Sequence, residues 1–472
     1  MINIYDILTK RTGHLLKIAL LDTQGQISYT KLLGAIEKRS NQIKKFNLKN
    51  QSLIAIYTGR GIQYWIDLLA IWSCNCIAIP LNHSSAKNKL DNIIEQTQPR
   101  LIILNNQIQD TKSNSNYYNL PYNTAIINFS SGTTGDPKGI PLTHEALYEN
   151  LKATSHALRG FTSSDKLFIN IGFQFISALS HFLVTLYKGA SILSCESSYS
   201  GADLVELINK FKISAFGGSP CQASWILEHG DKLINRLNWI MSSGDFLSPT
   251  TINNFLKKMS TTKIYCAYGM TELSGRFCIL EPTQLPSLIG SVGKPISCLK
   301  LKIIDEKNNE LNSFEIGNVL VKGSSLFCGY LNQPQLDQNN WFNTGDIGYL
   351  DHNGNLFLKG RSDNVIKLSG HKISTFEIDN FLLDLRIFSD IVTLVMQPDS
   401  DQKKLVTFYT LKQNFKFNRP EISRSIRTQL SSLHIPAYFI EIKNIPRTKS
   451  GKAIRKELEK IALTQIENTT PR

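Results

Sequence analysis

The stretch that decides the fold reads Phe129-Ser130-Ser131-Gly132-Thr133-Thr134-Gly135-Asp136-Pro137-Lys138-Gly139. It continues the apolar run Ala125-Ile126-Ile127-Asn128-Phe129, which predicts a buried strand. A strand that runs into such a loop offers backbone N–H groups, hydroxyl donors and one ammonium, which together can hold a polyphosphate. The loop is not a Walker A motif, because Pro137 stands where that spacing requires glycine. We therefore predict a phosphate-binding loop; the alternative is an ordinary turn.

This loop resembles the phosphate-binding signature of the acyl-adenylate-forming superfamily, which includes acyl-CoA synthetases, nonribosomal peptide synthetase adenylation domains and luciferases. The resemblance implies that ATP activates a carboxylic acid, with Mg²⁺ as cofactor, and that a thiol then takes the acyl group. It assigns nucleotide binding to Ser130, Ser131, Gly132, Thr133, Thr134, Gly135 and Lys138. It also gives Thr134 and Lys138 a part in the chemistry.

The composition is that of a globular protein with more than one domain. The 472 residues exceed what one hydrophobic core usually supports, and the hydrophobic and charged fractions, 42% and 19%, exclude a disordered chain. The N-terminus lacks a signal-peptide pattern, and the apolar stretch 65–81 is interrupted by Asp67 and Asn75. The eight cysteines lack metal-binding spacing. We expect a cytoplasmic protein with no integral membrane association.

The formal net charge of +14 is the one unusual bulk property. The lysines are dispersed and no nucleic-acid-binding motif accompanies them, so we expect no nucleic-acid partner. A solvated basic surface is the plainer interpretation. The sharper one is attraction of ATP, of the CoA phosphates or of an acidic carrier protein. The sequence does not indicate the oligomeric state.

The fold class indicated by the patterning is α/β, because predicted strands and helices alternate. We expect helices at 27–43, 61–73, 90–96, 178–187 and 203–210, and strands at 52–57, 76–80, 100–104, 166–170, 190–193 and 213–216. An exposed loop is expected over 105–123. From residue 290 the pattern favours strands, at 299–304, at 317–323 and on both sides of a turn at 351–355.

The expected architecture has a large N-terminal domain and a small C-terminal one. The first, an AMP-binding domain over 1–361, would comprise two α/β subdomains and a β-rich subdomain. The second, over 364–472, would be a mobile α+β lid. We draw the boundary at Arg361–Asp363. The resemblance implies that Asp363 is the hinge and that Gly370 lines the path of the thiol.

A second motif, Tyr268-Gly269-Met270-Thr271-Glu272, follows a predicted strand. Its aromatic ring offers a flat face for a base, its glycine permits close backbone approach, and its carboxylate suits Mg²⁺. In the superfamily this segment stacks on adenine, and the resemblance gives such roles to Tyr268, Gly269, Thr271 and, as the metal ligand, Glu272. Upstream, Gly244 and Asp245 resemble the turn that flanks adenine.

A third motif surrounds Asp346, in Thr344-Gly345-Asp346. A carboxylate on a tight glycine turn can accept hydrogen bonds from both ribose hydroxyls, whereas the alternative is an ordinary β-turn aspartate. The resemblance assigns Asp346 to ribose and Arg361 to ribose or phosphate. The last motif is Thr448-Lys449-Ser450-Gly451-Lys452. By resemblance, Lys452 bridges the substrate carboxylate and the α-phosphate while the adenylate forms.

The segment Phe173-Gln174-Phe175 bears on the class of carboxylic acid that is activated. Peptide synthetase adenylation domains carry an aspartate, paired with the α-ammonium of an amino acid, where this chain has Gln174. A neutral amide cannot neutralise a buried ammonium, so a fatty, aryl or hydroxy acid is favoured. Arg276 either faces the acid, which would then carry a second carboxylate, or lies on the surface.

We expect an AMP-forming acid–thiol ligase with CoA as the thiol. The alternative acceptor is the phosphopantetheine of a separate acyl or peptidyl carrier protein. From another class, the chain would be an inactive nucleotide-binding scaffold, against which Lys138, Glu272 and Lys452 argue.

Overall fold

The computed structural model describes residues 2–469 except 13–14, 58, 60, 83–86, 105, 114–119, 132–136, 196–198, 234–236, 246, 338, 363–364, 369–370, 397–403 and 448–452. It divides into two compact units, described separately here. Unit 1 comprises 1–247, 251–301 and 321–342; unit 2 comprises 248–250, 302–320 and 343–472. The predicted domain boundary at Arg361–Asp363 stays a prediction.

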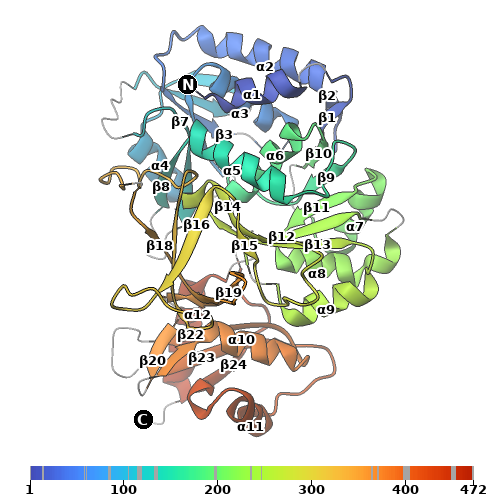
Figure 1. Ribbon diagram of the computed structural model, residues 1–472, viewed down its shortest axis with the longest axis vertical. Helices are drawn as coiled ribbons and strands as arrows, with labels where there is room; N and C mark the ends of the chain where they lie inside the picture. The colour runs from blue at the N-terminus through green and yellow to red at the C-terminus, as the bar shows by residue number, and fades with distance from the viewer. Residues whose placement is uncertain are drawn as a thin grey trace. The chain divides into compact units, whose positions relative to one another are not determined.

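Unit 1 contains a nine-stranded sheet whose central strands are parallel (Figure 1). Its order is β15 (Lys294–Pro295), β14 (Gly275–Leu280), β13 (Lys263–Met270), β12 (Trp239–Ser243), β11 (Ala215–Gly218), β9 (Lys166–Ile169), β10 (Ser191–Ser194), β1 (Ile18–Leu21) and β2 (Gln26–Ser28). Because β11, β12 and β13 are parallel, their carboxyl ends meet at one edge of the sheet, where ligands of α/β proteins commonly bind.

Unit 1 also contains a six-stranded sheet, with parallel strands at its centre. Its order is β6 (Gln107–Asp110), β5 (Leu101–Leu104), β3 (Leu53–Tyr57), β4 (Ile77–Pro80), β7 (Thr124–Ser131) and β8 (Pro137–Thr143). The prediction of a structureless loop over 105–123 was therefore wrong at Gln107–Asp110. This polar segment pairs antiparallel with β5 and forms an edge strand, which needs no apolar face.

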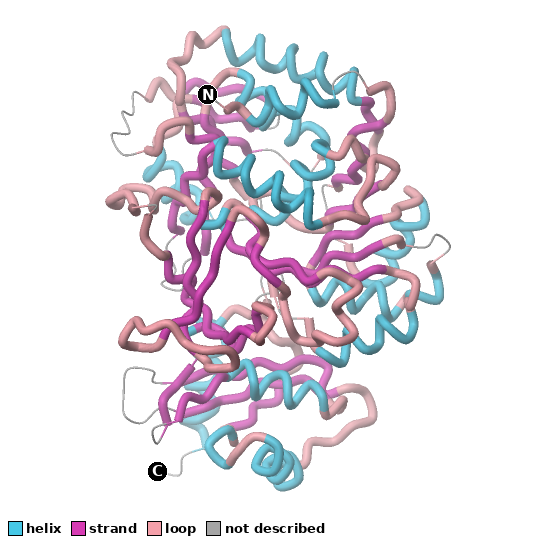
Figure 2. Tube along the Cα trace, viewed as in Figure 1, coloured by secondary structure: helices cyan, strands magenta, loops and turns pink. Residues whose placement is uncertain are grey.

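Helices cover both sheets, as Figure 2 shows. They are α1 (Ile4–Thr12), α2 (Tyr29–Lys44), α3 (Ile62–Ser73), α4 (Lys87–Thr97), α5 (His144–Ala157), α6 (Ile176–Tyr187), α7 (Gly201–Lys210), α8 (Pro220–Glu228), the 3₁₀ turn η1 (Gly230–Lys232) and α9 (Pro249–Lys258). Helices α1, α3, α5 and α6 contact one another, with α3 also on β3 and β4 and α6 also on β9, β10 and β14. The Trp65 ring of α3 stacks on Phe182 of α6 with 3.8 Å between centroids, so a helix packed on the six-stranded sheet contacts one packed on the nine-stranded sheet.

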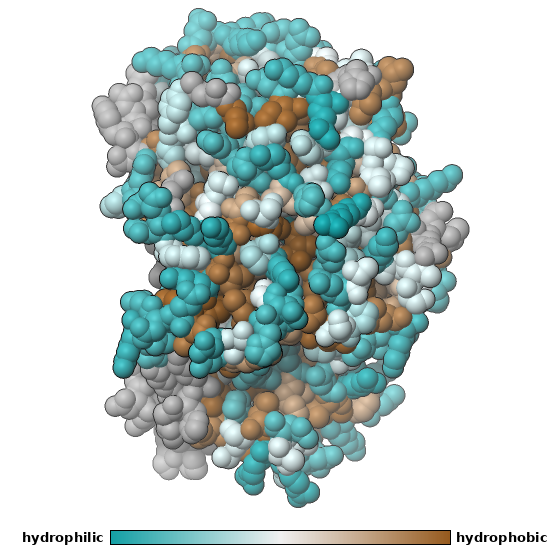
Figure 3. Space-filling view, in the orientation of Figure 1, coloured by the Kyte–Doolittle hydropathy of each residue, from teal (hydrophilic) through white to brown (hydrophobic). Residues whose placement is uncertain are grey.

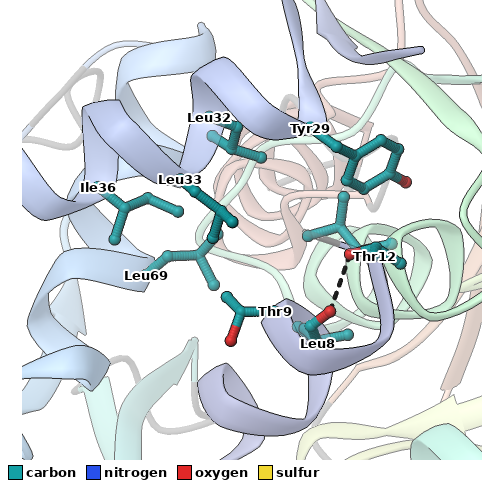
Figure 4. A pocket seen from close by; sticks show the side chains of 9 residues that line it. Leu8, Thr9, Thr12, Tyr29, Leu32, Leu33, Ile36 and Leu69 are labelled. Carbon is teal, nitrogen blue, oxygen red and sulfur yellow. Dashed lines mark hydrogen bonds between the residues drawn. The ribbon is translucent and has the colours of Figure 1, made fainter. Parts of the chain in front are cut away.

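A small apolar pocket lies among α1, α2, α3 and α6 (Figure 4). Leu8 of α1, Leu33 and Ile36 of α2 and Leu69 of α3 line it. The hydroxyl of Thr12, also in the lining, donates to the Leu8 carbonyl of its own helix at 2.8 Å. The lining therefore offers no charged group for a carboxylate or a phosphate.

A four-stranded sheet contributes residues to both units and has the order β16 (Leu299–Ile304), β17 (Gly317–Gly323), β18 (Phe342–Leu350) and β19 (Leu356–Arg361). The predicted turn at 351–355 joins β18 to β19, which are antiparallel. Gly354 in that turn has a φ of +78°, a conformation that favours glycine. The strands expected at 299–304 and 317–323 and the turn expected at 351–355 are confirmed.

The C-terminal part of unit 2 is a three-stranded sheet with helices on both faces. Its order is β22 (Phe388–Met396), β23 (Lys404–Leu411) and β24 (Tyr438–Glu441); a hairpin of β20 (Val365–Leu368) and β21 (His371–Ser374) precedes it. The helices are α10 (Thr375–Asp384), α11 (Arg419–Gln429), the 3₁₀ turn η4 (Ser432–His434) and α12 (Arg455–Thr469). Helices α10 and α11 share one core cluster with the sheet, and α12 shares the other.

The predicted α/β class is confirmed by these alternating elements. Hydrophilic residues cover much of the face in Figure 3, in keeping with the dispersed charge of the sequence. Among the helices that the described residues form, none combines the length and the apolar character needed to cross a bilayer.

Candidate active site

The predicted phosphate loop is the tip of the β7–β8 hairpin. Residues 132–136, which include Gly132, Thr133, Thr134 and Gly135, lie outside the described residues, as does the side chain of Ser131. On the two strands, Ser130 pairs with Lys138 and Phe129 with Gly139. The hairpin thus brings a predicted hydroxyl donor and the predicted ammonium opposite each other. Lys138 is exposed and lies on β8.

A tyrosine that the sequence analysis missed connects the two predicted nucleotide-binding motifs, the phosphate hairpin (β7–β8) and the Thr-Glu motif. The Lys138 Nζ atom lies 5.6 Å from the ring centroid of Tyr330. The hydroxyl of the same ring donates to Oε1 of Glu272 at 3.0 Å. The next residue is fixed by its backbone, since the Leu331 N–H donates to the Gly139 carbonyl at 2.8 Å. Tyr330 therefore links the phosphate hairpin to the Thr-Glu motif within unit 1.

Glu272 lies in η2 (Thr271–Leu273), directly after strand β13. Its backbone carbonyl accepts from the Phe327 N–H at 2.7 Å, and its side chain is half-buried. Mg²⁺ in nucleotide sites commonly takes one or two carboxylates and completes its shell with phosphates and water. A half-buried carboxylate next to the phosphate hairpin fits that ion, so Glu272 would be the protein ligand of Mg²⁺.

The predicted adenine motif requires its glycine for steric reasons. Gly269 pairs with Arg276 of β14, and a Cβ at position 269 would lie 2.1 Å from the carbonyl oxygen of Gly275. Only a residue without a side chain fits there. Tyr268 is half-buried beside Phe277, with 5.5 Å between ring centroids.

A buried asparagine holds the segment that follows Glu272. Asn150 of α5 is 1% exposed, and its Nδ2 donates to the carbonyls of Leu273 at 2.9 Å and Arg276 at 2.7 Å. Its Oδ1 accepts from the Arg276 N–H at 3.2 Å. Asn150 thereby fixes the backbone between Glu272 and Arg276, and the sequence analysis did not identify it.

Arg276 is buried, so the alternative of a surface arginine was wrong. Its exposed fraction is 3%, as is that of His181 on α6. Arg276 Nη2 lies 2.8 Å from His181 Nε2, and since a guanidinium only donates, the imidazole accepts. Burial, with Arg276 adding to it, lowers the pKa of His181 well below its usual value. Burial lowers the pKa of Arg276 to about 10, which leaves it charged at neutral pH.

The Phe173-Gln174-Phe175 segment leads into α6, and its three side chains differ in solvent exposure. Phe173 is buried and packs on the rings of Tyr64 and Trp65, with centroid distances of 5.2 and 4.7 Å. The Gln174 carbonyl accepts from Asn128 Nδ2 at 3.5 Å, while Gln174 and Phe175 are half-buried. These contacts tie the segment before α6 to α3 and to β7. The predicted contact of the three side chains with the acid stays a prediction.

In unit 2, Asp346 and Arg361 form a cross-strand pair. The prediction that Asp346 lies on a tight turn was wrong, because it lies within β18. Gly345 nevertheless has a φ of +74°, and Arg361 covers it. The Arg361 guanidinium donates to the Thr344 carbonyl at 2.9 Å and lies 3.5 Å from Asp346 Oδ1.

The remaining predicted site residues are only partly described. Gly244 and Asp245 are exposed after β12, and Gly244 has a φ of +93°. Asp363, Gly370 and Lys452 lie outside the described residues.

Comparison with known proteins identifies the family. Residues 10–331 match the family described as AMP-binding enzyme. A 2-succinylbenzoate–CoA ligase of Listeria monocytogenes is 24% identical, over 92% of this chain and 94% of its own length. Tyrocidine synthase 3 of Brevibacillus parabrevis is 22% identical over 96% of this chain, which spans only 8% of that protein.

Solved structures share the fold over nearly their whole length. The anthranilate CoA ligase AuaEII in complex with anthranoyl-AMP has a TM-score of 0.85 at 20% identity, and the alignment covers 98% of each chain. ATP-bound MatB from Rhodopseudomonas palustris has a TM-score of 0.85 at 19% identity, with 97% of this chain and 98% of MatB covered. With its family match extending from residue 10 to residue 331 and including the phosphate hairpin, the Thr-Glu motif and Tyr330, this chain belongs to the AMP-binding enzyme family.

Proposed function

We propose that this protein is an AMP-forming acid–thiol ligase, which activates a carboxylic acid with ATP and transfers the acyl group to CoA. The observation that carries the proposal is the arrangement of Lys138, Tyr330 and Glu272, in which one tyrosine has an ammonium near its ring and a carboxylate on its hydroxyl. Membership of the AMP-binding family supports it. So does the similarity to 2-succinylbenzoate–CoA ligases over almost their full length.

The chemistry explains why both charges are needed. A carboxylate oxygen attacks the α-phosphorus of ATP, the bond from that phosphorus to the bridging oxygen breaks, and pyrophosphate leaves with its electron pair. The acid is now a mixed anhydride with AMP as a good leaving group. Such a transfer needs positioning and charge neutralisation more than covalent help from the protein.

Each charged residue has a separate part in this step. Lys138 and the hydroxyls of Thr133 and Thr134 would hold the leaving pyrophosphate. Glu272 would hold Mg²⁺, which when bound neutralises phosphate charge. Lys452 would neutralise the attacking carboxylate. Tyr330, by donating to Glu272, keeps that carboxylate oriented and leaves its second oxygen for the ion.

The nucleoside would be held by the Tyr268-Gly269 motif and by the Asp346 motif. Tyr268 offers a ring face to adenine beside the close backbone approach at Gly269. Asp346 would accept the ribose hydroxyls, and its neighbour Arg361 supplies a positive charge for ribose or phosphate. These assignments come from the motifs and the local geometry.

In the second half-reaction a thiolate attacks the acyl carbonyl carbon, the bond to the AMP oxygen breaks, and AMP leaves. We propose that rotation of the C-terminal domain about Asp363 first removes Lys452 from the site and brings Gly370 to the path of the thiol. A hinge of this kind needs only a few residues that absorb the backbone change.

A second candidate acceptor is the phosphopantetheine of a separate carrier protein. The net charge of +14 favours an acidic partner, and peptide synthetases are among the relatives. CoA is the better-supported acceptor, because three of the similar curated proteins are named 2-succinylbenzoate–CoA ligases.

Acid-dependent exchange of labelled pyrophosphate into ATP tests the proposal. We expect exchange with at least one class of acid, and loss of about 100-fold or more in Lys138→Ala, since removing one donor to developing charge commonly has that effect. Lys416→Ala removes an exposed lysine of unit 2 and is the matched control. Exchange with no acid at all would support the inactive scaffold instead.

A further inference from the structure

Arg276 is a buried cation for which the described part of the chain provides no carboxylate. Its pKa is shifted by burial alone, with no acidic group contributing. Its Nε atom is buried and has no hydrogen-bond partner. A buried charge normally has a partner of opposite sign, because desolvation otherwise opposes its burial. The lack of a carboxylate partner therefore suggests that an anionic ligand binds Arg276.

His181 orients Arg276 but cannot neutralise it. The imidazole accepts one N–H from the guanidinium and stays neutral, because burial and the adjacent cation lower its pKa. The His181 ring packs directly against Gly217, since a Cβ at Gly217 would lie 2.6 Å from the imidazole. Gly217 of β11 thus makes room for the residue that holds Arg276.

The pair lies at the edge of the nine-stranded sheet where ligands of such folds bind. Gly217 is near the carboxyl end of β11, and Arg276, the second residue of β14, pairs with Gly269 of the predicted adenine motif. At the end of β12, the hydroxyls of Ser242 and Ser243 are also buried without a partner. Unpartnered polar atoms on β12 and β14, the two strands that flank β13, indicate that this edge is shaped for a polar group from outside the chain.

Helix α6 connects the pair to the predicted acid site. It carries His181 two turns after the Phe173-Gln174-Phe175 segment that leads into it. Its Ser180 is also the neighbour of Gly275, whose Cβ would lie 3.3 Å from the serine side chain. The same helix thus adjoins both the segment assigned to the acid and the start of β14.

We propose that Arg276, oriented by His181, binds a second carboxylate on the acid, and hence that the substrate is a dicarboxylic acid. The inference rests on the proposed function and names the substrate class of that same site. A guanidinium suits this task because Nε and one Nη form a planar fork that matches the two oxygens of a carboxylate. With Nη2 on His181, Nε is the donor still without a partner.

Pyrophosphate exchange with paired acids tests the proposal. Straight-chain and aromatic diacids are each compared with the monoacid that has a methyl group in place of the distal carboxylate. We expect wild-type kcat/KM to favour one or more diacids. Arg276→Met should lower kcat/KM for those diacids by about 100-fold, change the monoacids little and leave KM for ATP unchanged. Arg159→Met, at an exposed position, is the matched control.

Thermal unfolding gives a second readout that does not require turnover. We expect Arg276→Met to unfold at the wild-type temperature or above it, because the variant loses an unpaired buried charge. With ATP present throughout, addition of a diacid should raise the Tm of the wild type further and leave that of the variant unchanged. Arg276→Lys, which keeps the charge and loses the fork, should retain only a small part of the diacid preference.

Three results would overturn the inference while leaving the proposed function intact. They are a wild-type preference for monoacids, an equal loss with diacids and monoacids in Arg276→Met, and a raised KM for ATP in that variant, which would assign Arg276 to the nucleotide. A Tm several degrees below the wild type would show an intrinsic structural role instead. Absence of exchange with every acid would reject the proposed function itself, and this inference with it.

Discussion

Replacing Tyr330 with phenylalanine tests the link between the phosphate hairpin and Glu272. The substitution removes the hydroxyl that donates to Glu272 Oε1 at 3.0 Å and keeps the ring that lies 5.6 Å from Lys138 Nζ. Glu272 remains half-buried with one donor fewer, so its carboxylate is less firmly oriented toward the metal. We expect a defect in adenylation rather than in folding.

The size of the defect follows from the kind of bond that is lost. A hydrogen bond to a charged group contributes about 1.5–3 kcal/mol, which corresponds to a loss of about 10- to 150-fold in kcat/KM for pyrophosphate exchange. Tyr330→Leu removes the ring as well. A cation–π contact at a partly exposed site is worth about 0.5–1 kcal/mol, so this variant should lose about 2- to 5-fold more.

The assay is pyrophosphate exchange at saturating acid over a range of Mg²⁺ concentrations. Tyr330→Phe should need more Mg²⁺ for half-maximal exchange, whereas Tyr187→Phe, on α6, should behave as the wild type. If Tyr330→Phe exchanges at the wild-type rate with unchanged Mg²⁺ dependence, the link between Tyr330 and Glu272 has no catalytic importance and the reasoning is refuted.

Three further predictions concern other parts of the chain. Lys452→Ala should lose adenylation by about 100-fold or more yet still transfer the acyl group from supplied acyl-AMP, as measured in separate half-reactions; equal losses would contradict the assignment. Asp67→Ala should destabilise unit 1 by about 3–5 kcal/mol in urea unfolding, because it strands the buried Arg39 guanidinium 2.6 Å away; adding Arg39→Met should restore most of that loss. Burial lowers the pKa of His144 to about 4, below its ordinary value near 6.5. Between these two pH values the unfolded chain therefore binds a proton that the folded chain does not. The stability that is present above pH 6.5 is lost as the pH falls toward 4. The loss should be about 2 kcal/mol at pH 5 and absent in His144→Leu but not in the exposed control His156→Asn.

Much of the fold could be predicted because local patterns agree with tertiary structure. The helix expected at 27–43 appears as Tyr29–Lys44, since its apolar residues recur at helical spacing and Ser28 caps it by accepting from the Lys31 N–H. The segment Gln107–Asp110 could not be predicted, because an edge strand with no buried face shows no alternation. Asp346 was misplaced for a related reason: a glycine with positive φ indicated a turn, yet β18 continues through it.

The candidate site could be predicted only where a motif is continuous in sequence. The hairpin that bears Lys138 and the segment that bears Glu272 were both identified, but the tyrosine between them lies 58 residues from Glu272. Asn150 likewise acts on backbone groups more than a hundred residues away. Such contacts leave no local pattern. The burial of Arg276 was hidden for the same reason, because the packing of α5 and α6 against β14 encloses it.

The central claim is that the protein joins an acid to a thiol through acyl-AMP. One measurement addresses it directly: incubate the protein with ATP, Mg²⁺, CoA and a panel of mono- and dicarboxylic acids, and identify the products by mass spectrometry. We predict acyl-CoA, AMP and pyrophosphate in equal amounts, with acyl-AMP accumulating when CoA is omitted. Formation of ADP and phosphate, or of no acyl-AMP with any acid, would contradict the account.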